Sequence, residues 1–274
     1  MTRAAEFPWR IAGLGISAFA CLVLVYLVLP TLVIVPLSFS SEAFLSFPPP
    51  GFSLRWYQAF AASIDFRLAI MNSVLIGVPA SLLATIAGTC AALGLTRGSL
   101  KYRRGLSALM IAPIVLPQIL LAIGLFPIMV KVGLNGTFPG IVLAHAVVAM
   151  PLVFITVTAA LRSYPPSLEL AAMTLGAPPW STFWHVTFPM IRVGVLVGFI
   201  FAFSFSFDEL ILAIFLTAPA TRTVPRLLWE QLNYQLTPVI AAATVVLLSI
   251  TLLLLLAAAL ADRGRSLKAG RQPA

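Results

Sequence analysis

The sequence predicts an all-α integral membrane protein, and three observations support this fold class. First, 61% of the 274 residues are hydrophobic and only 9% are charged, whereas soluble globular chains carry about 25% charged residues. Second, apolar runs longer than about 18 residues recur along the chain, and such runs are typical of membrane-spanning helices. Third, the sequence has no GxxxxGK phosphate loop, no GxGxxG after a strand and no HExxH zinc motif.

Six apolar runs are each long enough to cross a hydrocarbon core of about 30 Å at about 1.5 Å per residue. Prolines inside them, such as Pro79 and Pro117, predict kinks rather than helix ends, because neighbouring helices can satisfy the freed carbonyl groups. The first run continues well past Cys21, so we expect an uncleaved span rather than a signal peptide. The expected spans, within one domain of residues 1–274, are about 11–37, 68–95, 106–130, 140–161, 193–216 and 239–261.

The basic residues predict the orientation of these spans. If the N-terminus lies inside, 12 of the 17 Lys and Arg residues fall on that side and five on the other. The positive-inside rule then places both termini and the loop 162–192, between the fourth and fifth spans, in the cytoplasm. We interpret the net charge of +9 as this topology signal and as a contact with membrane lipid headgroups, not as a nucleic-acid surface.

The loop 162–192 is expected to fold as two short helices. Ser167 is the expected N-cap of the first, and Gly176 ends it because glycine adopts a positive φ without strain. Pro178 and Pro179 begin the second helix, which groups Trp180, Phe183 and Trp184 on one face. The pattern alone leaves two interpretations open. The helices either lie on lipid or the bundle as an interfacial lid, or they dock a cytoplasmic partner through apolar anchors.

The first of these helices has the sequence ELAAMTLGA, from Glu169 to Ala177, and Phe188-Pro189 follow it. This pattern resembles the EAA loop of permease subunits in binding-protein-dependent, type I ABC importers. There the loop is a coupling helix that enters a groove on the ATPase subunit. The family glutamate is Leu170 here, and moving the carboxylate one place earlier turns it by about 100° around the helix. The coupling residues implied by the resemblance are Glu169, Ala171, Ala172, Gly176 and Ala177.

The stretch AFSFSFDELILAIFLTAP, residues 202–219, resembles the fifth span of the spermidine/putrescine branch of that family. The resemblance implies the second permease subunit of a polyamine-type importer in a bacterial inner membrane. It also implies a separate ATP-binding cassette ATPase dimer that binds ATP and Mg²⁺, a second homologous permease and a periplasmic solute-binding protein. This chain itself is expected to need no cofactor and to be no enzyme.

Of the eight carboxylates, only Asp208 and Glu209 fall inside an expected span. An ionised Asp at the centre of a bilayer costs about 2.5–3.5 kcal/mol. It therefore either pairs with a partner subunit or caps a helix break, or it binds a cationic substrate. Gln118 is a further intramembrane polar residue where the polyamine branch has an aspartate, which suggests a solute with fewer charges. The expected substrate pathway comprises Asp208, Glu209, Ser204, Gln118 and the interfacial Trp56 of the outer loop.

Two other classes of function compete with an importer permease. A stand-alone secondary transporter often shows internal repeats and several intramembrane charges, whereas this chain shows one acid pair. A membrane-embedded enzyme would need a second acid in another span or a His/Cys cluster. The alternatives to an amine importer are therefore an importer for another small solute or a secondary transporter, and copurification with an ATPase would separate these two.

Overall fold

The computed structural model describes residues 7–234, 237–250 and 252. The described chain is mostly helical, and its only β-type pairing is an isolated bridge between Ser40 and Phe52. It divides into two compact units. One comprises Met1–Ser63 together with Gln231–Ala274, and the other comprises Ile64–Glu230.

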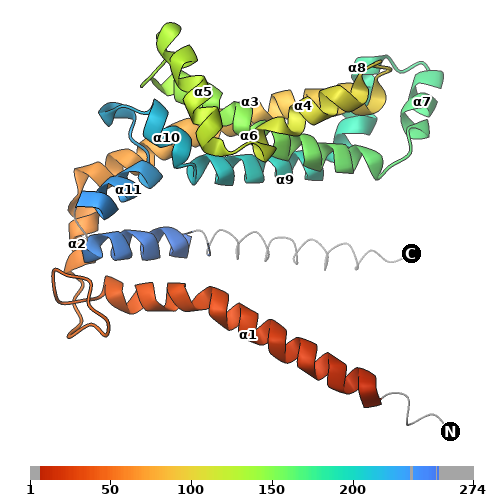
Figure 1. The fold of residues 1–274 in the computed structure, drawn as a ribbon. Coiled ribbons are helices and arrows are strands. Elements are labelled where there is room, and N and C mark those ends of the chain that lie inside the picture. The colour runs from red at the N-terminus through yellow and green to blue at the C-terminus, as the bar shows by residue number, and fades with distance from the viewer. Residues whose placement is uncertain (1–6, 235–236, 251, 253–274) are drawn as a thin grey trace. The chain divides into compact units, whose positions relative to one another are not determined.

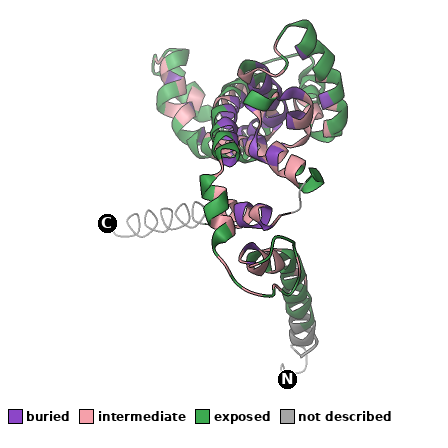
Figure 2. Cartoon of the chain, turned by 90° about the vertical axis from the view of Figure 1, so that its left-hand side faces the viewer, coloured by how far each residue is buried: buried purple, intermediate pink, exposed green. Residues whose placement is uncertain are grey.

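The first unit contains α1 (Phe7–Ser38), α2 (Arg55–Ala62) and a helix at Pro238–Ile250. The expected first span, 11–37, lies within the helix α1, and most of its described side chains are exposed within this chain (Figure 2). The segment after α1 folds back on the end of that helix, since the Ser38 and Tyr57 hydroxyls lie 2.6 Å apart.

The core of the second unit is formed by α3 (Ile64–Arg97), α6 (Phe138–Arg162) and α9 (Phe188–Phe207), which lie side by side (Figure 1). Buried residues line their shared faces, while the outer faces remain apolar and exposed (Figure 2). Small residues permit this close packing, as they do in many membrane bundles. A Cβ atom at Gly194 of α9, for example, would lie 2.6 Å from the Ala160 Cβ of α6.

The expected third span, 106–130, is not one kinked helix. It is split into α4 (Arg103–Val115) and α5 (Gln118–Lys131), which bend by 100° with respect to each other. Leu116 is extended, with ψ at 140°, because the residue before a proline is driven out of the helical region. Pro117 therefore ends a helix, where the sequence had predicted only a kink.

The expected fifth span, 193–216, also differs from the structure. Its helix α9 ends at Phe207, and a short helix, α10 (Ile211–Leu216), begins after a break of three residues. At its other end, α9 continues without interruption from α8 (Pro179–Thr182) and a π-helical turn at Phe183–Thr187. The membrane-length segment is therefore Pro179–Phe207.

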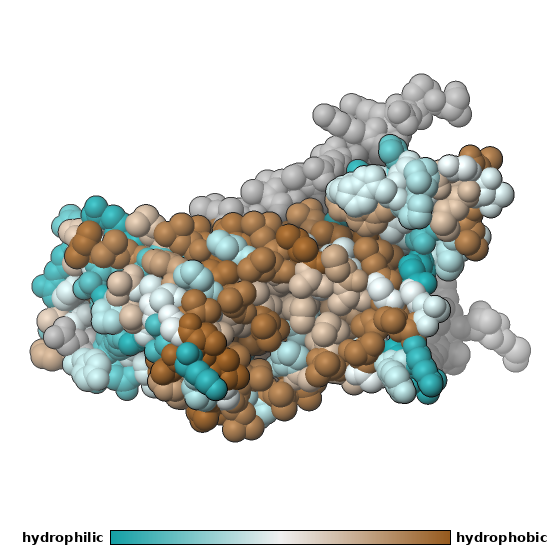
Figure 3. All heavy atoms as spheres, turned by 90° about the horizontal axis from the view of Figure 1, so that it is seen from above, coloured by the Kyte–Doolittle hydropathy of each residue, from teal (hydrophilic) through white to brown (hydrophobic). Residues whose placement is uncertain are grey.

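Among the described residues, four helices are long and apolar enough to cross a membrane, or five if α4 and α5 together form one broken span. Only Pro238–Ile250 represents the expected sixth span, 239–261, since most of its remainder lies outside the described residues. Apolar side chains gather over the middle of the face drawn in Figure 3, and polar ones gather toward its margins.

The loop between α6 and α9 contains α7 (Ser167–Thr174) and α8, as the sequence predicted in outline. Gly176 adopts a φ of +88° directly after α7, which confirms the expected glycine turn. The expected N-cap was wrong, since Pro166 occupies that position and α7 begins at Ser167 without a side-chain cap. Beyond α10, a 3-10 turn at Pro219–Thr221 leads into α11 (Val224–Tyr234).

Candidate functional site

Four of the five residues expected in the substrate pathway line one cavity of about 660 Å³ in the second unit. Gln118 comes from α5, Ser204 from α9, and Asp208 and Glu209 from the break between α9 and α10. The remaining lining residues are apolar: Leu152, Phe201, Phe205, Leu210 and Ile211. The cavity therefore combines an apolar wall with a small polar group at one place, as ligand pockets generally do.

Two broken helices meet at this cavity. Gln118 is the first residue of α5, directly after the Pro117 break, and Asp208 is the C-cap of α9. The helices that follow the two breaks pack together, since Leu121 and Leu125 of α5 lie in one apolar cluster with Leu212 of α10. Irregular backbone at membrane depth is tolerated where protein buries it or where it lines a cavity.

The two neighbouring acids have different surroundings. Glu209 is 4% exposed, and its Oε1 accepts a hydrogen bond from the Leu212 backbone N–H at 2.9 Å. It therefore caps the start of α10, which is one of the two structural roles considered for this acid pair. The Asp208 side chain is exposed to the cavity, and within the described part of the chain no ion pair involves it.

Asp208 thus offers a carboxylate to whatever occupies the cavity. Ser204 lies one helical turn earlier, and the Asp208 N–H donates to the Ser204 carbonyl at 3.1 Å, so their side chains share one face of the helix. The rings of Phe201 and Phe205 line the same space. A carboxylate, a hydroxyl and aromatic faces together suit a small cation such as an ammonium group.

Trp56, the fifth expected pathway residue, belongs to the first unit. Its indole N–H donates to the Ser40 carbonyl at 2.8 Å, and the Arg55 guanidinium lies 4.3 Å from the centre of its ring system. These contacts tie α2 to the segment that follows α1, and they give Trp56 a local structural role.

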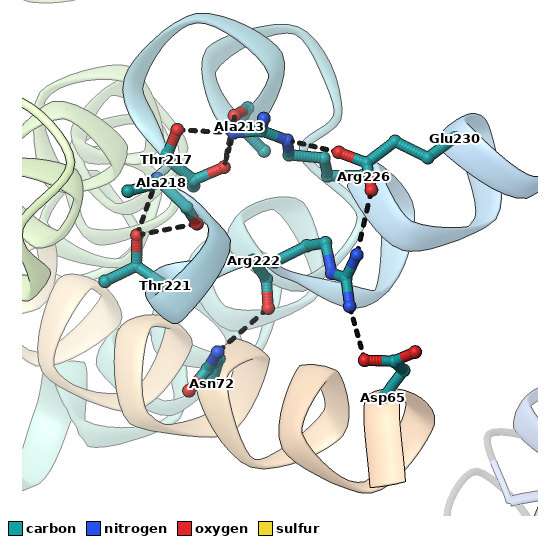
Figure 4. A network of polar contacts seen from close by, with 9 residues as sticks. All are labelled: Asp65, Asn72, Ala213, Thr217, Ala218, Thr221, Arg222, Arg226 and Glu230. Atoms are coloured by element: carbon teal, nitrogen blue, oxygen red, sulfur yellow. Dashed lines mark hydrogen bonds and ion pairs between the residues drawn. The ribbon is translucent and has the colours of Figure 1, made fainter. Parts of the chain in front are cut away.

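The segment after α10 is held to the start of α3 by a polar network (Figure 4). Arg222 donates to Asp65 at 2.7 Å and to Glu230 at 3.1 Å, and Arg226 donates to Glu230 at 2.8 Å. Asn72 of α3 donates to the carbonyls of Ala220 and Arg222, both at 3.0 Å. Because two cations and two acids balance within this network, it fixes the end of α10 without adding net charge near the cavity. From the sequence, Arg222 and Arg226 had served only as topology signals.

The residues expected to couple to an ATPase lie on or just after α7, but Glu169 is turned inward. Its Oε1 accepts a hydrogen bond from the Arg97 Nε at 3.1 Å and another from the Tyr164 hydroxyl. Ala171 and Gly176 are exposed, whereas Ala172 and Ala177 are half-buried. Sequence reasoning missed both partners. Arg97 lies 72 residues away and leaves no local pattern, whereas Tyr164 is only five residues away and its spacing could have suggested the contact.

Burial raises the pKa of Tyr164, and its hydrogen bond to Glu169 raises that pKa further. The Tyr164 hydroxyl therefore keeps its proton at neutral pH and donates a hydrogen bond to the Glu169 carboxylate.

The second short helix forms the aromatic cluster that its spacing predicts. Ring centroids lie 5.6 Å apart for Trp180 and Trp184, and 5.0 Å apart for Phe183 and Trp184. Phe188, at the start of α9, joins them at 5.1 Å from Trp184. Trp180 remains 71% exposed, so the cluster offers an apolar surface beside α7.

The described residues thus combine long apolar helices, two broken segments around a cavity and a structured loop between α6 and α9. A crystal structure of a bacterial ABC transporter involved in the import of the acidic polysaccharide alginate has the same fold. The TM-score is 0.72 at 15% identity, and the match covers 96% of this chain and 98% of the other. The fold is therefore that of an ABC transporter permease.

Residues 77–266 match the family described as binding-protein-dependent transport system inner membrane component, and the chain belongs to this family. It is 31% identical over 248 residues to the putrescine transport system permease protein PotI of Escherichia coli K12, covering 88% of this chain and 86% of PotI. It is 26% identical over 232 residues to the spermidine/putrescine transport system permease protein PotC of Haemophilus influenzae, covering 84% and 90%. These matches confirm the resemblance to type I importer permeases. Together with the several apolar helices, they support a multi-pass protein of a bacterial inner membrane.

Proposed function

We propose that this chain is a permease subunit that passes a small, cationic amine solute of the polyamine kind from a periplasmic binding protein to the cytoplasm. The cavity beside Asp208 carries the proposal. An unpaired carboxylate at membrane depth needs water or a cation to offset its desolvation cost, and an amine supplies the cation. PotI and PotC, which are permeases for putrescine and spermidine/putrescine, support the same solute class.

The proposal includes the finer topology. Six spans form one domain over residues 1–274, both termini are cytoplasmic, and the loop 162–192 lies inside as the coupling loop. Family membership favours this arrangement over a stand-alone secondary transporter, since binding-protein-dependent permeases work in assemblies. We expect an ATPase dimer that binds ATP and Mg²⁺, and a second, homologous permease that completes the pathway.

Copurification tests the assembly. The tagged chain, isolated in mild detergent from its native cells, should bring down an ATPase and a second permease. The associated binding protein should bind putrescine or spermidine in calorimetry. Recovery of the chain alone, with amine uptake into ATPase-free proteoliposomes, would instead establish a secondary transporter.

Asp208→Asn tests the cavity, because it keeps the shape and the hydrogen bonding of the side chain while removing the charge. We expect the complex to assemble and the apparent affinity for the transported amine to fall at least about tenfold, or about 1.4 kcal/mol. Glu42→Gln, which neutralises an exposed carboxylate outside the cavity, is the matched control. Transport of the amine at unchanged affinity by Asp208→Asn would remove this acid from the pathway, and a complex that dissociates would assign it to subunit assembly.

A further inference from the structure

The end of α3 is joined to the loop helix α7 through a single cluster of side chains. Arg97 is the last residue of α3, and it makes three different contacts. Its Nε donates to Glu169 of α7 at 3.1 Å, one terminal nitrogen donates to the Leu161 carbonyl of α6 at 2.9 Å, and the guanidinium lies 4.8 Å from the Tyr164 ring centre. One arginine therefore connects two membrane-length helices with the loop.

The cluster is shielded from solvent. The side chains of Arg97 and Glu169 are 19% and 14% exposed, and Tyr164 is 4% exposed. Ion pairs on an open surface contribute little, about 0–1 kcal/mol. This pair is partly buried, and the Tyr164 hydroxyl is a second donor to the same carboxylate oxygen. Removing Glu169 would thus leave two donors without their acceptor.

Because the Glu169 side chain points into the chain, other residues form the exposed surface of α7. Glu169 is the only charged residue of α7. Leu170, which stands where the family pattern has its glutamate, is 59% exposed, and Met173 and Leu175 are 41% and 89% exposed. The exposed surface of α7 is therefore uncharged and is apolar around Leu170 and Met173, and the only carboxylate of the helix is held within the chain.

We infer that Arg97, Tyr164 and Glu169 form a latch that fixes α7 on the ends of α3 and α6, so that the docking helix and these two spans move as one body. Glu169 is then a positioning residue and not a contact to the ATPase, which meets the apolar face around Leu170 instead. This inference rests on the proposed function of the loop as a coupling element.

The first test is Glu169→Gln in the complete importer, reconstituted in proteoliposomes with its binding protein. The ratio of ATP hydrolysis with putrescine and binding protein to hydrolysis without them should fall at least about fivefold, the scale of a typical coupling free energy. Glu42→Gln should keep the wild-type ratio. A wild-type ratio for Glu169→Gln would overturn the latch.

A cross-link separates a latch from a direct ATPase contact. Arg97 and Glu169 are both replaced by Cys in a chain whose two native cysteines, Cys21 and Cys90, are changed to Ala. Bridging the introduced thiols with a short, reducible bis-thiol linker restores a covalent tie between α3 and α7. If the two helices move together, bridging retains or raises uptake relative to the unbridged variant. Uptake that bridging abolishes and reduction restores would show that they must move apart.

Hydrogen–deuterium exchange gives a readout that does not depend on the solute. In the purified complex, Glu169→Gln should speed amide exchange in residues 163–177 and leave α11 unchanged. Unchanged exchange in residues 163–177 would overturn the latch whatever the solute is. Faster exchange there in the Glu169→Gln variant, combined with a wild-type importer whose ATP hydrolysis putrescine fails to stimulate, would support the latch and contradict the proposed amine substrate.

Discussion

Asp208 and Glu209 are adjacent in the chain and differ in what the fold demands of them. Glu209 supplies an acceptor for a helix that would otherwise begin with an unpaired backbone N–H, and it is buried by doing so. Asp208 has no such capping role within the described chain, and its side chain faces the cavity. The sequence identified the pair but could not assign the two roles, because it did not reveal the break in which both residues lie, between α9 and α10.

Gly176 and Gly133 have similar surroundings, so substitutions at these two glycines can be compared directly. Both have positive φ, +88° and +72°, and a Cβ at either position would meet no atom within 4 Å in this chain. Gly176→Asp and Gly133→Asp therefore carry the same backbone strain, about 1–2 kcal/mol. We expect only Gly176→Asp to abolish transport and stimulated ATP hydrolysis, because in the proposed assembly Gly176 lies in the loop that approaches the ATPase.

Uptake assays and membrane abundance of both variants decide this prediction. Wild-type transport by Gly176→Asp, at normal abundance, would rule out close docking at that glycine. Equal loss of transport in both variants would attribute the effect to strain.

The bundle of α3, α6 and α9 depends on small residues at the positions where the helices cross. Gly198 and Gly194 of α9 approach Thr156 and Ala160 of α6, and Gly88 of α3 approaches Val153. In lipid, such close packing replaces the hydrophobic drive that holds soluble helices together. The sequence revealed the apolar helices through their length, but it did not reveal which glycines lie at crossings.

A matched pair of glycine substitutions tests this packing. Gly194→Ala places a Cβ 2.6 Å from the Ala160 Cβ and 3.1 Å from the Thr156 carbonyl oxygen, and overpacking of this kind costs about 1–3 kcal/mol. Gly124→Ala in α5 meets no neighbour within 4 Å, and alanine is the better helix former by about 1 kcal/mol. We expect the thermal midpoint in detergent to fall for Gly194→Ala and to stay or rise for Gly124→Ala. A drop in both variants would mean that the position of the glycine is irrelevant.

The elements also show why some boundaries were predictable and others were not. The expected spans 11–37 and 140–161 match α1 and α6 closely, because continuous apolar runs with suitable ends admit few alternatives. The spans 106–130 and 193–216 failed where polar or proline residues interrupt the run. Whether Pro117 bends or ends a helix depends on neighbours that the local sequence does not specify, and the same holds for Asp208.

At the scale of the whole molecule, α3 is the longest helix among the described residues. Its 34 residues extend about 51 Å at about 1.5 Å per residue. The Asp65–Arg222 ion pair lies at its first turn and the Arg97–Glu169 ion pair at its last residue. The segment 217–230 and the loop helix α7 therefore lie at opposite ends of α3, which agrees with a protein that faces two compartments.

This separation yields a prediction about orientation. Single cysteines at Ser167 and Asn135, both exposed positions, should differ toward a membrane-impermeant thiol reagent in intact spheroplasts. Because the positive-inside rule places loop 162–192 in the cytoplasm, the Ser167 variant should react only after permeabilisation. The Asn135 variant, in the loop before α6, should react at once. The opposite labelling pattern would invert the topology and detach the loop from any cytoplasmic ATPase.

The two broken helices have a consequence for the hydration of a travelling solute. Where α4 and α9 stop, backbone carbonyls lose their intrahelical donors, and at membrane depth such groups require protein partners or water. The cavity is lined by residues next to both breaks, Gln118 and Asp208, so the proposed pathway would offer polar groups to an entering ammonium group. We expect such a group to exchange part of its hydration shell for these polar groups. The barrier to crossing would then be a series of small, reversible exchanges of solvation rather than one full dehydration.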